Sequence, residues 1–369
     1  MIENFHAVIP AGGSGTRLWP VSRASSPKFL HDVLGTGSTL LQATWERAAQ
    51  LADPAHTWVV TGQAHAEAVA AQLPRLRADR IVAEPSPKDS AAAIGLAAML
   101  ISDRDPDAVI GSFSADHSIT NVGEFLAVVE QAAAAAASTG DIVTIGITPT
   151  YPATAYGYIE TGGLLGIPGA PTARRAAAFV EKPDAVTARQ YAYSGGYRWN
   201  AGMFIMRAAS LLELIEQEAP DLHAGLRRIA DTAGTPGWDE AMRREWPQLE
   251  KKAIDYVVAE PAAAAGRVIV VPGDFGWDDV GDFDSVAKLR QPVPGESTAV
   301  SVVGEAEVID IASRGVVVSE TGRTVALVGV QDMVVVDTED VVLVTSRAQA
   351  QLVKKAVAEA EARGRTDLL

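Results

Sequence analysis

Short apolar runs alternate with longer stretches of helical spacing from the start of the chain to about residue 290. The apolar runs predict buried strands at 5–10, 57–61, 108–113 and 142–147. The stretches between them predict helices at 39–52, 90–99 and 122–137. This alternation is typical of βαβ units, in which helices cover both faces of a mostly parallel sheet. Ligands in such sheets bind beyond the carboxyl ends of the strands, so residues that follow apolar runs are the first candidates for a site.

The pattern changes after a segment rich in Pro and Gly at 291–295. Helical spacing returns before it, at 208–218 and 238–260. Beyond it, short Val-rich runs are broken by Gly, Asp and Thr, which predicts a small all-β unit, and 347–363 predicts a closing helix. We therefore expect a catalytic domain at 1–290 and a small β domain at 291–369.

Composition excludes several classes of protein. The 369 residues include no cysteine, which excludes disulfides and thiolate metal sites. The net charge of −15 argues against a nucleic acid or an anionic membrane as partner. No apolar run reaches the roughly 18 residues of a membrane span, and the N-terminus lacks the basic start of a signal peptide. We expect a cytoplasmic location.

A glycine-rich turn follows the first apolar run. It offers small residues and backbone N–H groups at Ala11, Gly12, Gly13, Gly15 and Thr16. Glycines let the backbone approach a phosphate closely, and Arg17 and Lys28 add two cations. The P-loop is excluded, and Leu18 stands where the dinucleotide fingerprint needs its third glycine, which argues against a dehydrogenase. From this motif alone, a turn without any ligand remains the alternative.

The same segment resembles the signature of the sugar-1-phosphate nucleotidyltransferases. Leu18-Trp19-Pro20, followed by Ser22-Arg23, is similar to the mannose-1-phosphate guanylyltransferase branch. Further motifs in the family's order extend the resemblance over nearly the whole chain. It implies an α/β fold with a Rossmann-like nucleotidyltransferase domain, whose sheet is mixed and mostly parallel. A small C-terminal β-helix-like unit and a terminal helix would follow that domain.

Two aspartates lie in motifs that are far apart in the sequence. Asp116 follows the apolar run 108–113, and Asp279 lies in Gly-Trp-Asp-Asp-Val-Gly-Asp at 276–282. Carboxylates are the hard oxygen ligands that Mg²⁺ takes, although such aspartates often cap helices or lie in solvated loops. The resemblance implies that Asp116 and Asp279 bind Mg²⁺, with Asp278 competing for the second position.

Three motifs in the middle of the chain predict a sugar-phosphate site. Glu181 can accept hydrogen bonds from hydroxyls while Lys182 pairs with a phosphate, although a surface ion pair is the alternative. Asn200 offers both a donor and an acceptor, and Gly157 and Gly202 permit close approach of the backbone. The resemblance implies that this set binds the sugar phosphate.

The nucleotide base is expected at Glu84 and Ser90. A carboxylate such as Glu84 can accept from guanine N1–H and from the exocyclic amine together. The family continues with Asn-Thr-Ala-Pro where this chain has Asp89-Ser90-Ala91-Ala92, so the sequence departs from the pattern here.

The resemblance implies that GTP and mannose 1-phosphate react to give GDP-mannose and pyrophosphate. The sugar phosphate is already an anion at pH 7, so the attack needs positioning and charge neutralisation, not a general base. Arg17 and Lys28 would stabilise the leaving pyrophosphate, and Lys182 would hold the nucleophile.

Two rival functions remain, together with predictions about assembly. The same fold could use UTP or dTTP with glucose 1-phosphate, or the chain could be a non-catalytic paralogue that binds a sugar nucleotide. We also expect a homodimer that involves the β unit. The isomerase domain of longer family members is not expected.

Overall fold

The computed structural model describes residues 1–13, 15–290 and 299–369, and these divide into two compact units. The α/β unit comprises 1–12, 44–115 and 119–277, and the β unit comprises 13–43, 116–118 and 278–369. The expected linker at 291–295 lies outside the described residues, as does Ser14 of the glycine-rich turn. The boundary between 290 and 291 stays a prediction.

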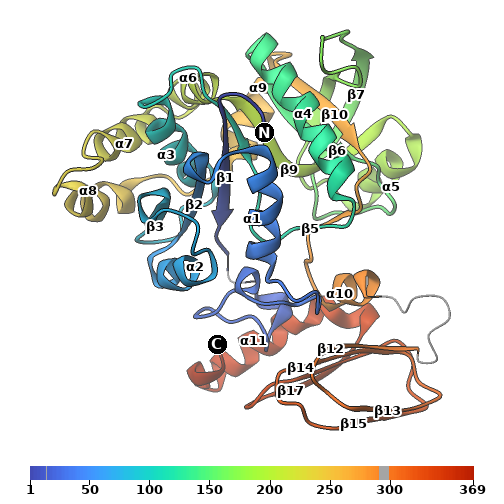
Figure 1. The fold of residues 1–369 in the computed structure, drawn as a ribbon. Coiled ribbons are helices and arrows are strands. Elements are labelled where there is room, and N and C mark those ends of the chain that lie inside the picture. Colours follow the sequence, from blue (N-terminus) through green and yellow to red (C-terminus); the bar gives the residue numbers. More distant parts are fainter. Residues whose placement is uncertain (14, 291–298) are drawn as a thin grey trace. The chain divides into compact units, whose positions relative to one another are not determined.

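The α/β unit is built on a nine-stranded mixed sheet (Figure 1). Its strands are β1 (Phe5–Ala11), β2 (Thr57–Gly62), β3 (Ile81–Glu84), β4 (Val109–Ser112), β6 (Ile142–Ile147), β7 (Tyr158–Leu164), β8 (Arg174–Val180), β9 (Tyr197–Arg207) and β10 (Val268–Gly273). The order is β3-β2-β1-β4-β9-β6-β10-β8-β7. The strands from β3 to β4 are parallel, and so are β6 and β10. β9 runs antiparallel to β4 and β6, which makes the sheet mixed as expected.

Helices cover both faces of this sheet. α3 (Ser90–Ser102), α6 (Ala208–Glu218) and α7 (Pro220–Ala230) share one buried cluster with inward residues of β1, β2 and β3. α4 (Val122–Thr139) packs on β6, β9 and β10 from the other side. The remaining helices are α1 (Leu40–Leu51), α2 (Ala66–Gln72), α5 (Ala185–Ser194), α8 (Trp238–Glu245) and α9 (Glu260–Ala264).

Two helical expectations need correction. The stretch 238–260 is not one helix, because α8 ends at Glu245 and Pro247 lies in a short 3-10 turn. A π-helical turn, Asp255–Ala259, then leads into α9. At the end of the chain, α11 (Val353–Ala362) begins only after a 3-10 segment at Arg347–Leu352.

The β unit consists of short stacked strands, as the sequence predicts. One sheet contains β12 (Val300–Gly304), β14 (Gly315–Ser319), β16 (Met333–Asp337) and β17 (Val342–Ser346), and the other contains β13 (Val308–Ile311) and β15 (Val325–Val328). β12, β14 and β16 are parallel, as are β13 and β15. Val317 and Leu327 are buried together between the sheets, and this arrangement is β-helix-like.

The other face of the four-stranded sheet forms a second core of the β unit. It includes residues of α10 (Phe283–Leu289) and α11, and also Leu18 and Trp19 of the glycine-rich signature. A further two-stranded sheet pairs β5 (Ser118–Ile119) with β11 (Trp277–Asp278). Among the helices described, none has the length and apolar character that a membrane crossing requires.

Candidate functional site

The glycine-rich turn is held by buried neighbours in the β unit. Gly13 and Gly15 have φ values of +84° and +60°, which favour glycine. A Cβ on Gly15 would stand 2.9 Å from Cβ of Lys28, so this position also lacks room for a side chain. Trp19 is buried just beyond the turn, and its Nε1 donates to the carbonyl of Leu368 at 2.6 Å. The turn is therefore anchored by the core of its own unit.

Lys28 links the two predicted metal-binding aspartates. Its side chain is buried, and Nζ lies 2.9 Å from Oδ2 of Asp116. The same nitrogen donates to the main-chain oxygens of Asp279 at 2.7 Å and Val280 at 3.2 Å. An ammonium has three donors, and here all three are used. The structure thus brings together three predicted catalytic residues that are distant in the sequence.

The electrostatics around Asp116 favour its charged form. Burial works toward the neutral acid, but the Lys28 ammonium and His117 hold the pKa of Asp116 below its ordinary value. Arg17, the fourth predicted catalytic residue, is exposed, and no ion pair of its guanidinium is found in the parts of the chain that the structure describes.

Asp278 and Asp279 differ in their surroundings. Oδ1 of Asp278 accepts from the backbone N–H of Val280 at 2.7 Å and so closes its own turn. Burial raises the pKa of Asp278, which disfavours the carboxylate form that a metal needs. The carboxylate of Asp279 lies instead beside Gly281, whose missing side chain leaves it room. This geometry favours Asp279 over Asp278 as a ligand.

The residues around Lys28 fit a divalent cation. Within the described residues no group of three or more His, Asp or Glu side chains is placed to hold a metal ion. Asp116 and Asp279 nevertheless provide carboxylate oxygens, and the carboxylate of Asp116 and the main-chain oxygen of Asp279 both contact the ammonium of Lys28. One or two carboxylates completed by substrate phosphates are the usual Mg²⁺ arrangement in phosphate-binding enzymes.

A second group of predicted residues lies in the α/β unit, just beyond β8. Only 6% of the Glu181 side chain is exposed, and Oε1 pairs with Nζ of Lys182. Oε2 is buried and has no hydrogen-bond partner in the described chain. A buried acceptor left unpaired is costly, whereas a hydroxyl of a ligand would satisfy it. Gly157 lies against this oxygen, and a Cβ at that position would collide with it. Gly157 immediately precedes β7, which begins at Tyr158.

Asn200, which is predicted to bind the sugar phosphate, makes several hydrogen bonds within the protein. From β9, its Oδ1 accepts from Thr144 Oγ1 at 2.8 Å and from the N–H of Gly202 at 3.1 Å. Its Nδ2 donates to Oδ1 of Asp255 at 2.9 Å. Asn200 therefore positions Gly202 and Asp255, and most of its hydrogen-bonding capacity is used within the protein.

Asp255 is a member of this group that the sequence analysis missed. Burial, assisted by the nearby charge of Glu181, raises its pKa to about 6, while Lys182 opposes the shift. The residue opens the π-helical turn, a form often found at functional sites. The sequence carries no local signal for it, because Asp255 lies within helical spacing.

Glu84 and Ser90 lie at the ends of β3 and α3. Glu84 is the last residue of β3 and is 8% exposed. Burial raises its pKa to about 7, although the backbone N–H of Lys88 works against that shift. The hydroxyl oxygen of Ser90 accepts from the N–H of Ile254 at 2.9 Å. Asp89 caps α3 by accepting from the N–H of Ser90 at 2.9 Å.

Comparisons with known proteins identify the class. Residues 6–294 match the family described as nucleotidyl transferase. Residues 306–359 match the family described as MannoseP isomerase/GMP-like beta-helix domain. The chain therefore has the α/β fold of a nucleotidyl transferase, followed by a β-helix domain.

Curated relatives and a solved structure define the branch. The chain is 38% identical to the xanthan biosynthesis protein XanB of Xanthomonas campestris pv. campestris, covering 98% of this chain and 74% of that protein. It is 36% identical to the mannose-1-phosphate guanylyltransferase of Escherichia coli strain K12, covering 98% and 75%. A crystal structure described as mannose-1-phosphate geranyltransferase from Thermus thermophilus has a TM-score of 0.84 and 33% identity, covering 97% and 99%. The chain belongs to the mannose-1-phosphate guanylyltransferases of the nucleotidyl transferase family. Nucleotidyltransferases of this family generally use a divalent metal.

Proposed function

We propose that this protein transfers GMP from GTP to mannose 1-phosphate and releases GDP-mannose and pyrophosphate. The contacts of Lys28 carry the proposal, because its ammonium pairs with the carboxylate of Asp116 and holds the main chain at Asp279 in a nucleotidyltransferase fold. The substrates are inferred from relatives named mannose-1-phosphate guanylyltransferase, which match nearly the whole chain.

The chemistry is an in-line attack by a sugar phosphate oxygen on the α-phosphorus of the nucleotide. The nucleophile is already ionised, so the protein has to position the reactants and neutralise charge. Mg²⁺ bound at Asp116 and Asp279 would supply positive charge to the reacting phosphates. Lys28 fixes both aspartates and adds its own charge beside them, and the exposed guanidinium of Arg17 pairs with the leaving pyrophosphate.

The backbone of the glycine-rich turn contributes to nucleotide binding. N–H groups at Gly12, Gly13 and Gly15 approach the phosphates where side chains would block access. Ala11 and Thr16 flank them and complete the turn.

The residues beyond β8 hold the sugar phosphate. Oε2 of Glu181 accepts a hydroxyl of the sugar, which satisfies an acceptor that is otherwise buried and unpaired. Lys182, whose side chain is 55% exposed, pairs with the phosphate. Asn200 and Gly202 keep the surrounding backbone and Asp255 in position.

Glu84 recognises the base. Its carboxylate accepts from guanine N1–H and the exocyclic amine, a pair of donors that uracil and thymine do not present. Ser90 supports this segment through its hydrogen bond with Ile254.

A nucleotide panel scored by pyrophosphate release tests the reaction. With mannose 1-phosphate as acceptor, GTP gives the highest kcat/KM, and preference for UTP or dTTP would contradict the guanine assignment. Chelation by EDTA abolishes activity and added Mg²⁺ restores it. Asp116→Ala abolishes pyrophosphate release, whereas full activity in this variant would overturn the metal site and favour a different mechanism.

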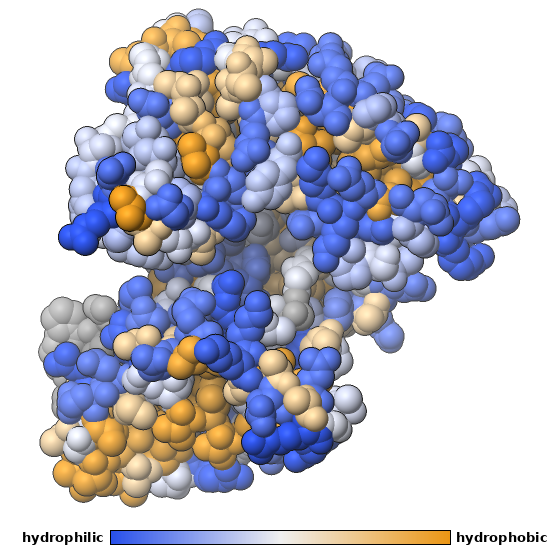
Figure 2. Space-filling model, turned by 180° about the vertical axis from the view of Figure 1, so that it is seen from behind, coloured by the Kyte–Doolittle hydropathy of each residue, from blue (hydrophilic) through white to orange (hydrophobic). Residues whose placement is uncertain are grey.

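A homodimer and a cytoplasmic location are further parts of the proposal. The outer face of the small sheet in the β unit exposes Ile309, Ile311 and Val328 by 48%, 56% and 63%. Figure 2 shows a broad hydrophobic area over the strands of this unit. Apolar patches of this kind mark interfaces, so we expect a second copy to cover this face. Light scattering tests the dimer, and a monomer at micromolar concentration would contradict it.

A further inference from the structure

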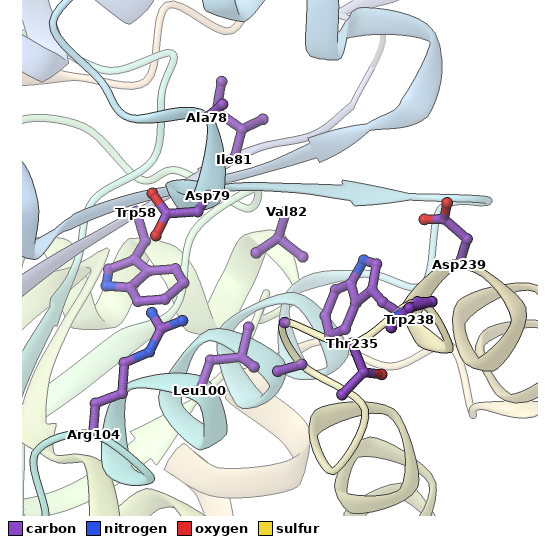
Figure 3. Close-up of a pocket in the computed structure, with 13 residues that line it drawn as sticks. Trp58, Ala78, Asp79, Ile81, Val82, Leu100, Arg104, Thr235, Trp238 and Asp239 are labelled. Atoms are coloured by element: carbon purple, nitrogen blue, oxygen red, sulfur yellow. The ribbon is translucent and has the colours of Figure 1, made fainter.

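A pocket of about 450 Å³ opens in the α/β unit, at the N-terminal ends of β2 and β3. Trp58 is the second residue of β2, and Ile81 is the first residue of β3. Leu100, near the end of α3, lies between Trp58 and Trp238 in Figure 3, and Thr235 of the loop between α7 and α8 lies beside Trp238. Its volume is in the range of pockets that hold small organic ligands.

This pocket is separate from the predicted base-binding residues. Glu84 is at the opposite end of β3 from Ile81, and Ser90 is at the opposite end of α3 from Leu100. A helix rises 1.5 Å per residue, so Ser90 and Leu100 are about 15 Å apart along α3. None of the residues assigned to the proposed reaction lines the pocket.

Two tryptophans face the pocket from opposite sides. Trp58 is 1% exposed, and Trp238, at the start of α8, is only partly buried. In Figure 3 the indole of Trp238 stands across the pocket from Trp58, with Val82 and Leu100 between them. Guanidinium groups already lie over the Trp58 ring, so Trp238 is the aromatic surface that a ligand can reach.

Arg104 provides positive charge at the same pocket. Its Cζ lies 5.1 Å from the centre of the Trp58 ring, which holds the guanidinium by a cation–π contact. Asp79, the nearest acidic residue of the lining, is bound by Arg77 at 2.8 Å and by Arg80 at 3.2 Å. For Arg104, the residues that the structure describes provide no acidic side chain within 4.0 Å.

We propose that this pocket is a second, non-catalytic binding site for a nucleoside diphosphate. The base stacks on Trp238, and the phosphates pair with Arg104, since aromatic stacking and guanidinium pairing are two means by which proteins hold nucleotides without a metal. Asp239, which also lines the pocket, accepts from ribose hydroxyls. A purely apolar ligand would leave the charge of Arg104 unused, and a free phosphate would leave most of the cavity and Trp238 uncovered.

Equilibrium dialysis with labelled GDP tests the proposal on the full chain. We expect two GDP per chain in the wild type, one in the proposed active site and one in the pocket. Arg104→Ala and Trp238→Ala each weaken the second site by tenfold or more, so that at a GDP concentration about ten times the wild-type dissociation constant the amount bound falls from nearly two per chain to about 1.5 or less. Arg243→Ala is the matched control, because it removes an arginine of α8 that does not line the pocket, and it keeps two.

The outcome is independent of the proposed reaction. If the active site bound no GDP, the wild type would bind one equivalent, and Arg104→Ala would still remove it. Arg104 is exposed, so its replacement leaves the fold and the rate of pyrophosphate release unchanged. The same GDP stoichiometry and affinity in wild type, Arg104→Ala and Trp238→Ala would overturn the proposal.

Discussion

Replacing Glu84 by Gln removes the charge of the predicted guanine-binding carboxylate and keeps its size. The side chain is 8% exposed at the end of β3, and burial raises its pKa to about 7. Below that pH the side chain is mostly the neutral acid. This form lacks the two charged acceptor oxygens that the N1–H and amine of guanine require. Above it the carboxylate forms, so recognition of GTP through Glu84 strengthens as the pH rises.

The size of the effect follows from the pKa. A group with a pKa near 7 is about one tenth ionised at pH 6 and about nine tenths ionised at pH 8. If only the ionised form binds guanine, kcat/KM for GTP rises about tenfold between these values. A charged hydrogen bond contributes about 1.5–3 kcal/mol, so Glu84→Gln lowers kcat/KM at pH 8 by roughly ten- to a hundredfold.

The assay is the pH profile of kcat/KM for GTP at saturating mannose 1-phosphate, for the wild type and for Glu84→Gln. Titration of the substrates themselves is common to both proteins, so the difference between the profiles isolates Glu84. We expect an inflection near pH 7 in the wild type only. The assignment of Glu84 to the base would be refuted if the ratio of the two kcat/KM values did not change with pH, or if Glu84→Gln showed the same inflection near pH 7.

Three further substitutions test other parts of the account. Gly157→Ala raises KM for mannose 1-phosphate and leaves KM for GTP unchanged, because the new Cβ collides with Oε2 of Glu181. Gly163→Ala is the control, because a Cβ at that position meets open space. Equal KM values for mannose 1-phosphate in the two variants would contradict the role of Gly157. Trp19→Phe lowers the unfolding free energy of the β unit by about 1 kcal/mol in urea titrations, because it removes the buried bond to the Leu368 carbonyl. Arg23→Ala breaks a partly exposed ion pair with Asp340 and lowers the unfolding free energy by less than about 1 kcal/mol. A larger loss in Arg23→Ala than in Trp19→Phe would contradict the role of the Trp19 hydrogen bond as the anchor of the turn.

The parallel part of the fold was predictable from local sequence. The residues of β1, β2, β4 and β6 are buried on both faces, so each strand appears in the sequence as a mainly apolar run, interrupted only at single positions such as His6 and Thr144. β8 was not predicted, because it begins with two arginines and continues with three alanines, which do not favour a strand. β13 was not predicted either, since only alternate residues of this short strand face the core.

The site was predictable only in part. The resemblance pointed to Lys28, Asp116 and Asp279, but no local pattern indicates that the ammonium of Lys28 contacts the carboxylate of Asp116 and the main chain of residues 279 and 280. The inward hydrogen bonds of Asn200 depend on β6 and on the π-helical turn at Asp255, which are distant in the sequence. Such contacts follow from tertiary packing, which residue spacing alone does not specify.

The central claim is that a phosphate oxygen of mannose 1-phosphate attacks the α-phosphorus of GTP. Mannose 1-phosphate labelled with ¹⁸O in its phosphate group, incubated with GTP, Mg²⁺ and the enzyme, tests this claim by mass spectrometry of the products. The account predicts that all the label appears in GDP-mannose and that the pyrophosphate is unlabelled. Label in the pyrophosphate, or the absence of GDP-mannose, would contradict it.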